Sequence, residues 1–272
     1  MATIVLVLGG GDLASGVAYR LHRVGLRVAM TELPQPLAVR RLVSFAEAIY
    51  TGECTIEGIT AKKAPDFSDT LRILRIFANG QIPVMIDPQA DSRHALHPAI
   101  IIDARMKKSA PELGRHEATL FIGLGPGFNA GVNCHAAIET NRGHNMGRVI
   151  WQGATEPDSS VPEKVQDYGL ERVLRAPEDG YVESKVQIGD IVESGQILAE
   201  VGGQTVQAPF AGVVRGLIHP SLRVERGFKI GDIDPRGDPR LCLQISDKSL
   251  AVGGGVLEAI LSRPNLRPQL WS

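Results

Sequence analysis

The stretch 5–16 constrains this chain more than any other, because four apolar residues run directly into three consecutive glycines. Glycine lets a backbone turn sharply at the end of a buried strand and approach a ligand closely. The free N–H groups at the start of a following helix favour an anion. We therefore predict a phosphate-binding strand–turn–helix unit whose contact residues are Gly9, Gly10, Gly11, Asp12, Leu13 and Ala14.

The turn also matches a nucleotide fingerprint. Gly9-x-Gly11-x-x-Ala14 fits the dinucleotide-binding pattern with alanine in the third glycine position. Glu32 stands 21 residues beyond Gly11, where that pattern places an acidic residue for a ribose hydroxyl. A glycine-rich turn can also serve helix–strand packing alone, so the fingerprint leaves NAD binding and a purely structural turn both open.

Apolar strands alternate with helical patterns through the first half of the chain. The predicted strands are 27–31, 56–61, 82–87, 99–103 and 119–123, and the predicted helices are 13–24, 37–50 and 71–76. Near-continuous apolar strands of this kind are typical of a parallel sheet covered by helices on both faces. We expect an α/β, Rossmann-like doubly wound parallel sheet over residues 1–154.

Ligands of such sheets bind beyond the carboxyl ends of the strands. Several polar residues and glycines end or follow the predicted strands. They are Asp87, Asp103, Arg105, Gly125 and Gly127.

The segment 132–151 is predicted as a hairpin dense in ionisable groups. Its His135, Glu139 and His144 are candidate acid–base residues, and Arg142 is a candidate clamp for phosphate or carboxylate. The spacing of these side chains matches no known metal motif, so no metal is expected.

The charge balance excludes several classes of protein. With 29 basic and 30 acidic residues, neither a nucleic-acid binder nor a basic membrane-surface protein is indicated. We see no signal-peptide pattern and no apolar run of membrane-spanning length, and so expect a soluble, cytoplasmic protein. Cys54, Cys134 and Cys242 are odd in number and far apart, which predicts buried thiols rather than disulfides.

The second half contains an internal repeat. Ala176-Pro177 recurs 32 residues later as Ala208-Pro209, and Val192-Glu193-x-Gly195 recurs at the same offset as Val224-Glu225-x-Gly227. A fixed offset over two separate motifs indicates two copies of one unit of short strands and glycine turns. Residues 172–245 resemble the barrel-sandwich domain of biotinyl and lipoyl carriers.

A carrier of that family presents a modifiable lysine on the hairpin between its two halves. Here that turn is 200–205, and no lysine lies between Lys185 and Lys229. Amide attachment needs a lysine amine, so we expect neither covalent biotin nor lipoate. We predict a structural, docking or ligand-contact domain instead. The expected organisation is a first domain at 1–154, a linker at 155–171, an all-β barrel-sandwich domain at 172–247, and a C-terminal helix and tail at 248–272 that packs on the first domain.

Five motifs together resemble the YqeB-type proteins of the selenium-dependent molybdenum hydroxylase system, and the match spans nearly the whole chain. The motifs are 9–16, 125–128, 139–144, 229–236 and 253–259. Proteins of that family look like accessory factors encoded with molybdenum hydroxylases, and in the nucleotide-binding half they are distantly similar to xanthine dehydrogenase maturation factors. The resemblance implies a process, the maturation of a molybdopterin enzyme, rather than a reaction.

Three functions stay open at this point. The first is an accessory protein that binds a nucleotide or the phosphate-bearing molybdopterin, with a hydroxylase subunit as partner. The second is an NAD-dependent oxidoreductase with Glu32 on the ribose and His135 or His144 as the acid–base group. The third is a non-catalytic docking protein. Neither nucleic acid nor a membrane is expected as a partner, and the sequence leaves catalysis and homo-oligomerisation open.

Overall fold

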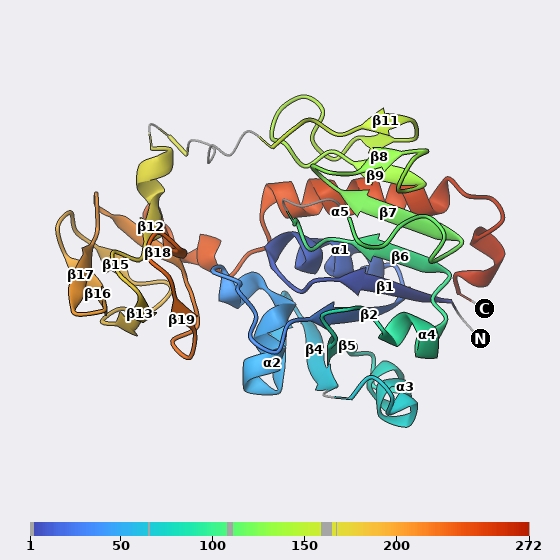
Figure 1. Ribbon diagram of the computed structural model, residues 1–272, viewed down its shortest axis with the longest axis horizontal. Coiled ribbons are helices and arrows are strands. Elements are labelled where there is room, and N and C mark those ends of the chain that lie inside the picture. The colour runs from blue at the N-terminus through green and yellow to red at the C-terminus, as the bar shows by residue number, and fades with distance from the viewer. Residues whose placement is uncertain (1–2, 65, 108–110, 159–164, 167, 272) are drawn as a thin grey trace. The chain divides into compact units, whose positions relative to one another are not determined.

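The computed structural model describes residues 3–64, 66–107, 111–158, 165–166 and 168–271 (Figure 1). The chain divides into two units. Unit 1 consists of Met1–Pro36, Phe45–Ser159 and Ile245–Ser272, and unit 2 consists of Leu37–Ser44 and Ser160–Gln244. The chain therefore passes from unit 1 to unit 2 twice.

Unit 1 is built on a nine-stranded sheet with the strand order β10-β9-β7-β6-β1-β2-β5-β4-β3. The seven strands from β9 to β4 are parallel, and β10 and β3 pair antiparallel with their neighbours at the two edges. The bounds are β1 Ile4–Leu8, β2 Arg27–Glu32, β3 Glu53–Ile56, β4 Ile59–Ala64, β5 Ile82–Ile86, β6 Ile100–Asp103, β7 Leu120–Leu124, β9 Ala136–Ile138 and β10 Val149–Ile150. A separate antiparallel pair joins β8 Asn129–Ala130 to β11 Gly153–Ala154.

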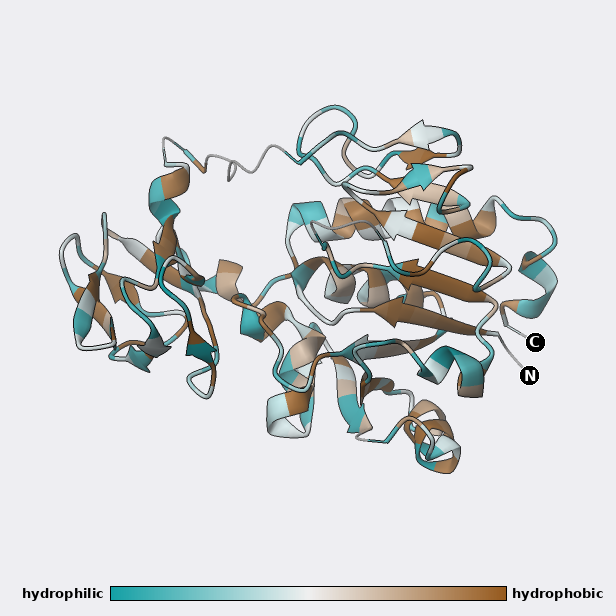
Figure 2. Ribbon diagram, in the orientation of Figure 1, coloured by the Kyte–Doolittle hydropathy of each residue, from teal (hydrophilic) through white to brown (hydrophobic). Residues whose placement is uncertain are grey.

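Helices cover both faces of this sheet. On one face α1 Asp12–Arg23 and α5 Asp247–Leu261 bury Val17 and Val256 against Val5 and Val7 of β1. On the other face α3 Thr70–Ala78 and α4 Ser92–Leu96 share a core with Leu6 and Leu8. Successive side chains of a strand point to opposite faces, so a strand buried on both faces has to be apolar throughout. Figure 2 shows the central strands accordingly in brown.

The predicted Rossmann-like doubly wound parallel sheet is wrong, because the observed sheet is mixed. The predicted strand 56–61 is in fact parts of two strands, β3 and β4, which form an antiparallel edge hairpin with Ile56 opposite Ile59. Glu57 and Gly58 turn the chain with φ of 45° and 83°. Two positive φ values in a two-residue loop are those of a hairpin turn. Glutamate at positive φ is uncommon, so the sequence carries little signal for this turn.

The predicted helix 37–50 is also wrong. The segment is divided into η1 Arg41–Val43, η2 Phe45–Glu47 and α2 Ala48–Thr51, and it changes unit between Ser44 and Phe45. Within unit 2, Arg40 donates to the carbonyl of Leu241 at 3.3 Å and Arg41 to that of Leu217 at 2.9 Å. These long-range contacts outweigh the helical spacing of the apolar residues, since propensity is a weak prior against tertiary context.

The described residues of unit 2 form three small antiparallel sheets, so the predicted single barrel-sandwich domain is wrong as well. Their strand orders are β12-β20-β18-β15, β14-β16-β17 and β13-β19. The bounds are β12 Val173–Arg175, β13 Gly180–Tyr181, β14 Glu183–Ser184, β15 Ile191–Val192, β16 Ile197–Val201, β17 Gln204–Gln207, β18 Gly212–Leu217, β19 Arg223–Val224 and β20 Lys229–Asp234, with η3 Leu170–Arg172 and η4 Pro239–Cys242.

The internal repeat is nevertheless present in three dimensions. The Ala176 N–H donates to the carbonyl of Phe228 at 2.9 Å, and the Ala176 carbonyl accepts from Gly227 at 2.8 Å. Ala208, the equivalent of Ala176, donates to Gln196 at 2.9 Å and accepts from Gly195 at 2.8 Å. Each copy therefore makes the same pair of backbone hydrogen bonds to the other, as a two-fold arrangement requires.

At the C-terminal end, the glycines at 253–255 lie inside α5, and α5 packs on α1 within unit 1. η5 Arg267–Gln269 follows. The predicted linker 155–171 includes residues 159–164 and 167, which lie outside the described residues. Among the helices of the described chain, none has both the length and the apolar character needed to cross a bilayer.

Candidate functional site

The parallel strands of unit 1 bring most of the predicted site residues to one edge of the sheet. Leu8 of β1 lies opposite Thr31 of β2 on one side and opposite Asp103 of β6 on the other. The glycine turn after β1 therefore lies between Glu32 and Asp103. The chain adds β2 and β5 on one side of β1 and later β6 and β7 on the other. Ligands of open α/β sheets bind where the strand order reverses in this way.

Each of the three glycines in the turn has a different physical role. Gly9 has φ of +96°, a conformation that favours glycine. A Cβ on Gly10 would lie 2.9 Å from the backbone nitrogen of Ala46, so Gly10 permits close packing of two backbones. A Cβ on Gly11 would meet nothing within 4 Å. Gly11 is the N-cap of α1, and the space next to it is open at the end of the helix where N–H groups lack intrahelical partners.

Glu32 is held against this turn. Its Oε2 accepts the N–H of Gly10 and its Oε1 accepts that of Leu33, both at 2.7 Å. Burial raises the pKa of the Glu32 carboxyl above its usual value of 4.5, although the two N–H groups act in the opposite direction. A carboxylate oxygen has a second lone pair, so Glu32 can still accept a hydrogen bond from a ligand hydroxyl.

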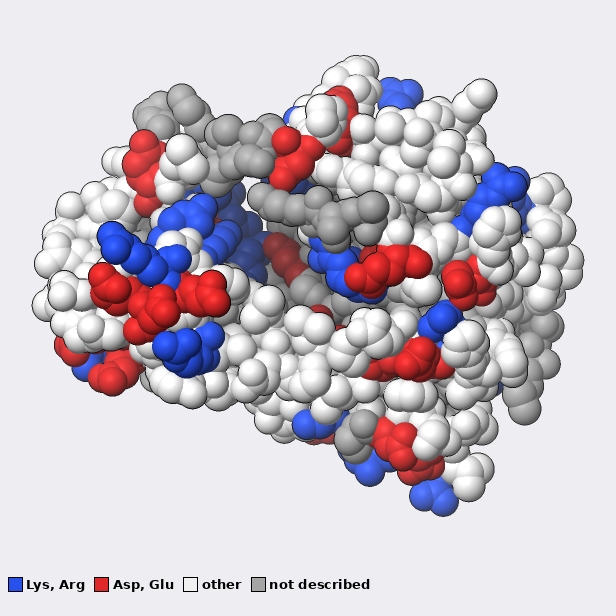
Figure 3. All heavy atoms as spheres, viewed as in Figure 1, with Lys and Arg blue, Asp and Glu red and all other residues white. Residues whose placement is uncertain are grey.

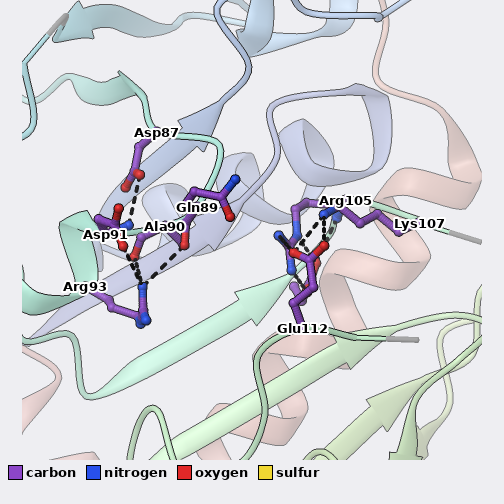
Figure 4. Close-up of polar contacts among 9 residues, drawn as sticks. Asp87, Gln89, Ala90, Asp91, Arg93, Arg105, Lys107 and Glu112 are labelled. Carbon is purple, nitrogen blue, oxygen red and sulfur yellow. Dashed lines mark hydrogen bonds and ion pairs between the residues drawn. The ribbon is translucent and has the colours of Figure 1, made fainter. Parts of the chain in front are cut away.

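On the other side of the turn Asp103 is buried and paired with Arg105. The guanidinium donates to Oδ2 at 2.6 Å and to Oδ1 at 3.0 Å. Arg105 also contacts Glu112 at 3.3 Å, and Lys107 donates to Glu112 at 2.9 Å (Figure 4). The backbone of Arg105 adjoins the turn, with its Cα 3.4 Å from an ideal Cβ on Gly9. The backbone of Arg105 is therefore close to the turn, and its cation is already neutralised by two carboxylates.

Asp87 has a structural role at the start of α4. Its two oxygens accept the backbone N–H groups of Asp91 at 2.9 Å and Ser92 at 2.8 Å. In Figure 4 Asp87 points toward Asp91, whereas Arg105 and Lys107 point toward Glu112. The structure thus places Asp87 at the predicted edge and uses both of its oxygens to hold a helix.

Gly125 and Gly127 follow β7 with φ of +70° and +93°. A Cβ on Gly125 would lie 2.4 Å from Oγ1 of Thr140, so this glycine lets the loops after β7 and β9 meet. Glu139, just after β9, is buried and accepts the N–H groups of Asn141 at 2.6 Å and Glu156 at 2.7 Å. Both carboxylate oxygens of Glu139 therefore hold loop backbone.

The predicted acid–base and clamp residues of 132–151 are spread apart. The hairpin itself is confirmed as the pair β9–β10. His135 precedes β9 at the opposite edge of the sheet, where its Nδ1 accepts the N–H of Phe121 at 2.9 Å. Burial, and then the charges of Arg263 and Arg115, lower its pKa. His144 is exposed in the turn after β9, and Arg142 donates to Asp247 of α5 at 2.9 Å.

Two features of the turn were missed from the sequence. Ser15 donates to the carbonyl of Gly10 at 3.0 Å and accepts the N–H of Phe45 at 2.7 Å. Ala46 donates to the same carbonyl of Gly10 at 2.8 Å. A serine among the buried residues of α1 was the available signal, because a buried hydroxyl needs a hydrogen-bond partner. In the described residues, no three His, Cys, Asp or Glu side chains are grouped as metal ligands.

A comparison with known sequences found a relative in Escherichia coli (strain K12), the uncharacterized protein YqeB. The two are 43% identical over 258 residues, which is 95% of this chain and 47% of the relative. The chain is similar to YqeB. It spans about half the length of that curated relative. No protein-family model matches the chain.

Among solved structures the likeness is weak. The product-bound ectoine utilization protein EutE (DoeB) from Ruegeria pomeroyi gives a TM-score of 0.26 at 12% identity, covering 85% of both chains. An aspartoacylase family protein from Mesorhizobium loti gives 0.26 at 9% identity, covering 85% of this chain and 84% of the other.

Proposed function

We propose that this protein is an accessory factor in the maturation of a molybdenum hydroxylase, and that it binds a nucleotide or the phosphate-bearing molybdopterin at the carboxyl edge of the large sheet. The ligand part rests on one observation, the open space at Gly11 at the start of α1. The maturation part rests on the resemblance to YqeB-type proteins.

The chemistry of the turn favours a ligand with both a phosphate and hydroxyl groups. Backbone N–H groups at the start of α1 can donate to phosphate oxygens, while Glu32 beside them can accept from a hydroxyl. An exposed helix terminus contributes only about 0.3–1 kcal/mol to holding a charge. Since Arg105 is already paired, the remainder of the ligand has to supply most of the affinity. Inorganic phosphate alone is therefore expected to bind this turn weakly.

The test uses Gly11→Val. Gly11 has φ of −68° and ψ of −175°, which valine adopts without strain, and the new side chain would fill the open space. We expect at least one of ATP, NAD and molybdopterin to raise the melting temperature of the natural protein, because a ligand that binds only the folded state stabilises it. Gly11→Val should lose that shift while keeping its fold by circular dichroism.

Gly254→Ala is the matched control. It also adds a side chain to a glycine of unit 1 with nothing within 4 Å, but in the middle of α5. It should keep the full ligand-induced shift. The ligand proposal fails if none of the three ligands shifts the melting temperature of the natural protein, or if Gly11→Val shifts as much as the control.

An NAD-dependent oxidoreductase is the weaker candidate, because His135, one of its two candidate acid–base residues, does not lie beside Glu32. His135 is at the opposite edge of the sheet. His144 is exposed in the turn after β9. The partner in our proposal is a hydroxylase subunit. Capture of a purified hydroxylase by the full chain, and its absence with an unrelated immobilised protein, tests that part separately.

A further inference from the structure

The motif 229–236 in unit 2 lies within a cluster of charged side chains that the proposed function does not use. We name it the β20 cluster. Its members are Arg172, Arg175, Arg215, Lys229, Asp232, Asp234 and Arg236. Five of these side chains are cationic and two are anionic. Figure 3 shows Lys and Arg side chains gathered on the face of unit 2 that it draws.

Strand pairing brings these residues together from distant parts of the sequence. β20 pairs with β12, where Arg175 lies opposite Lys229, and with β18, where Val213 lies opposite Asp234. The register of β18 shifts between Val214 and Gly216, which leaves Arg215 as the extra residue of a bulge. Bulges re-aim side chains and are common beside functional sites. Here the bulge places Arg215 near both aspartates, with nitrogen–oxygen distances of 3.9 and 3.7 Å.

The two aspartates of the cluster pair with its cations at different distances. Asp234 is fully buried and accepts from Arg236 at 2.6 and 2.9 Å. Asp232 lies 3.7 Å from Arg172, which is an ion pair but too long for a hydrogen bond. The cluster thus contains one tight ion pair, Asp234 with Arg236, and one aspartate, Asp232, whose ion pairs are longer.

Arg172 is the residue that indicates a ligand. Only 8% of it is exposed, and within the described structure its Nε and Nη1 have no hydrogen-bond partner. Oδ1 of Asp232 is also buried without one. Burying a charged group without hydrogen bonds is costly, and buried polar atoms in proteins are almost always paired. A group that accepts from a guanidinium and can donate one hydrogen bond would satisfy both side chains.

The lowered pKa of Lys229 agrees with an excess of positive charge in the β20 cluster. Desolvation by the surrounding protein lowers the pKa of Lys229 most, whereas the charge of Asp232 raises it. The charges of Arg172, Arg215 and Arg175 lower it further. An anion placed among these residues would offset their mutual repulsion.

We propose that the β20 cluster binds a phosphate group. Arg172 donates from its buried guanidinium to two phosphate oxygens, which is the geometry that guanidinium and phosphate groups favour. Lys229 supplies a second charge from the exposed side. A monoprotonated phosphate would also donate its hydroxyl to Asp232. The site lies wholly in unit 2 and does not depend on the proposed site at the glycine turn.

The test measures the melting temperature of the full chain against inorganic phosphate, with sodium chloride used to hold the ionic strength constant. Arg172→Met and Lys229→Met remove one cation each while keeping an unbranched side chain. Lys229→Met is the second variant because it changes an exposed position and leaves the buried pair of Arg172 and Asp232 intact. Arg223→Met and Arg226→Met are controls, since these arginines also belong to unit 2 but are 61% and 74% exposed and contact Asp179 and Glu178 instead.

We expect phosphate to raise the melting temperature of the natural protein and of both controls, and the apparent phosphate affinity to fall at least tenfold in Arg172→Met and Lys229→Met. Gly11→Val should respond like the natural protein, which separates this site from the glycine turn. A parallel series with AMP distinguishes a nucleotide monophosphate from free phosphate as the source of the group. The proposal is overturned if phosphate has no effect at constant ionic strength, or if Lys229→Met responds as the controls do.

Discussion

The N–H of Gly10 donates to the carboxylate of Glu32 at 2.7 Å, so the residue that ends β2 is joined directly to the turn that ends β1. This contact links two features that the sequence shows 22 residues apart. It also means that any ligand at the turn meets a carboxylate whose position is already set.

The first prediction concerns the pH dependence of Glu32. Burial raises its pKa in the folded state above 4.5, so ionisation is harder in the folded protein than in the unfolded chain. The stability that the raised pKa of Glu32 contributes is fully present below about pH 4.5, and it is lost as the pH rises through the pKa of the folded state. The unfolding free energy of the natural protein relative to Glu32→Gln should therefore decrease over that window. Urea denaturation at several pH values between 4.5 and 7.5 measures it, and a difference that stays constant or rises with pH would contradict the prediction.

The second prediction concerns the contact of α1 with α5. A Cβ on Gly16 would lie 2.5 Å from Cβ of Ser249, so Gly16→Ala should force the two helices apart and destabilise the protein by about 1–3 kcal/mol. Gly254→Ala, at an open position of α5, should instead stabilise it by up to about 1 kcal/mol. Chemical denaturation of both variants gives the comparison. Equal stability of the two would show that the helices do not pack this closely.

The third prediction concerns the thiols. Burial raises the pKa of Cys54 to about 12 and that of Cys134 to about 11, and it also raises the pKa of Cys242. The thiolate is the reactive form, so at pH 8 Cys134 should react roughly 200-fold and Cys54 roughly 2,000-fold more slowly than a free cysteine of ordinary pKa, and Cys242 should also react more slowly. Titration with Ellman's reagent checks this, with denatured protein as the control in which all three thiols react. Rapid modification of the native chain would count against the prediction.

The fourth prediction concerns the internal repeat. Gly195 and Gly227 are equivalent positions with φ of +80° and +82°, and an added Cβ would meet nothing within 4 Å at either. Alanine at each should cost about 1 kcal/mol from backbone strain alone. The two melting temperatures should therefore fall by nearly the same amount. If one substitution is neutral and the other severe, the two copies do not share their turn conformation in solution.

Local patterns in the sequence carry the strands and part of the site. The strands predicted at 27–31, 82–87 and 119–123 lie within one residue of β2, β5 and β7, because apolar runs bounded by turn residues are visible without tertiary information. Glu32 and the glycine turn are neighbours for a related reason. Successive strands of a sheet are usually adjacent, so their ends lie close together.

Other site predictions depended on distances that no local pattern contains. His135 is only four residues from Glu139, yet β9 runs between them, so His135 is at one edge of the sheet and Glu139 at the other. Gly253 and Gly255 of α5 line close backbone contacts with distant parts of the chain. A Cβ on Gly253 would lie 2.8 Å from the carbonyl oxygen of Gly16, and one on Gly255 would lie 2.1 Å from that of Gly147.

The sequence by itself determined where several strands of unit 1 run, that a glycine turn follows the first of them, and that residues 176–195 and 208–227 are two copies of one unit. These features depend on apolar periodicity and backbone freedom within a few residues. Only the tertiary structure decided that the large sheet is mixed, that unit 2 forms three small sheets, and that Arg172 is buried with unpaired nitrogen atoms. Strand direction, sheet membership and the pairing of buried charges are set by contacts between distant residues, which no single stretch of sequence specifies.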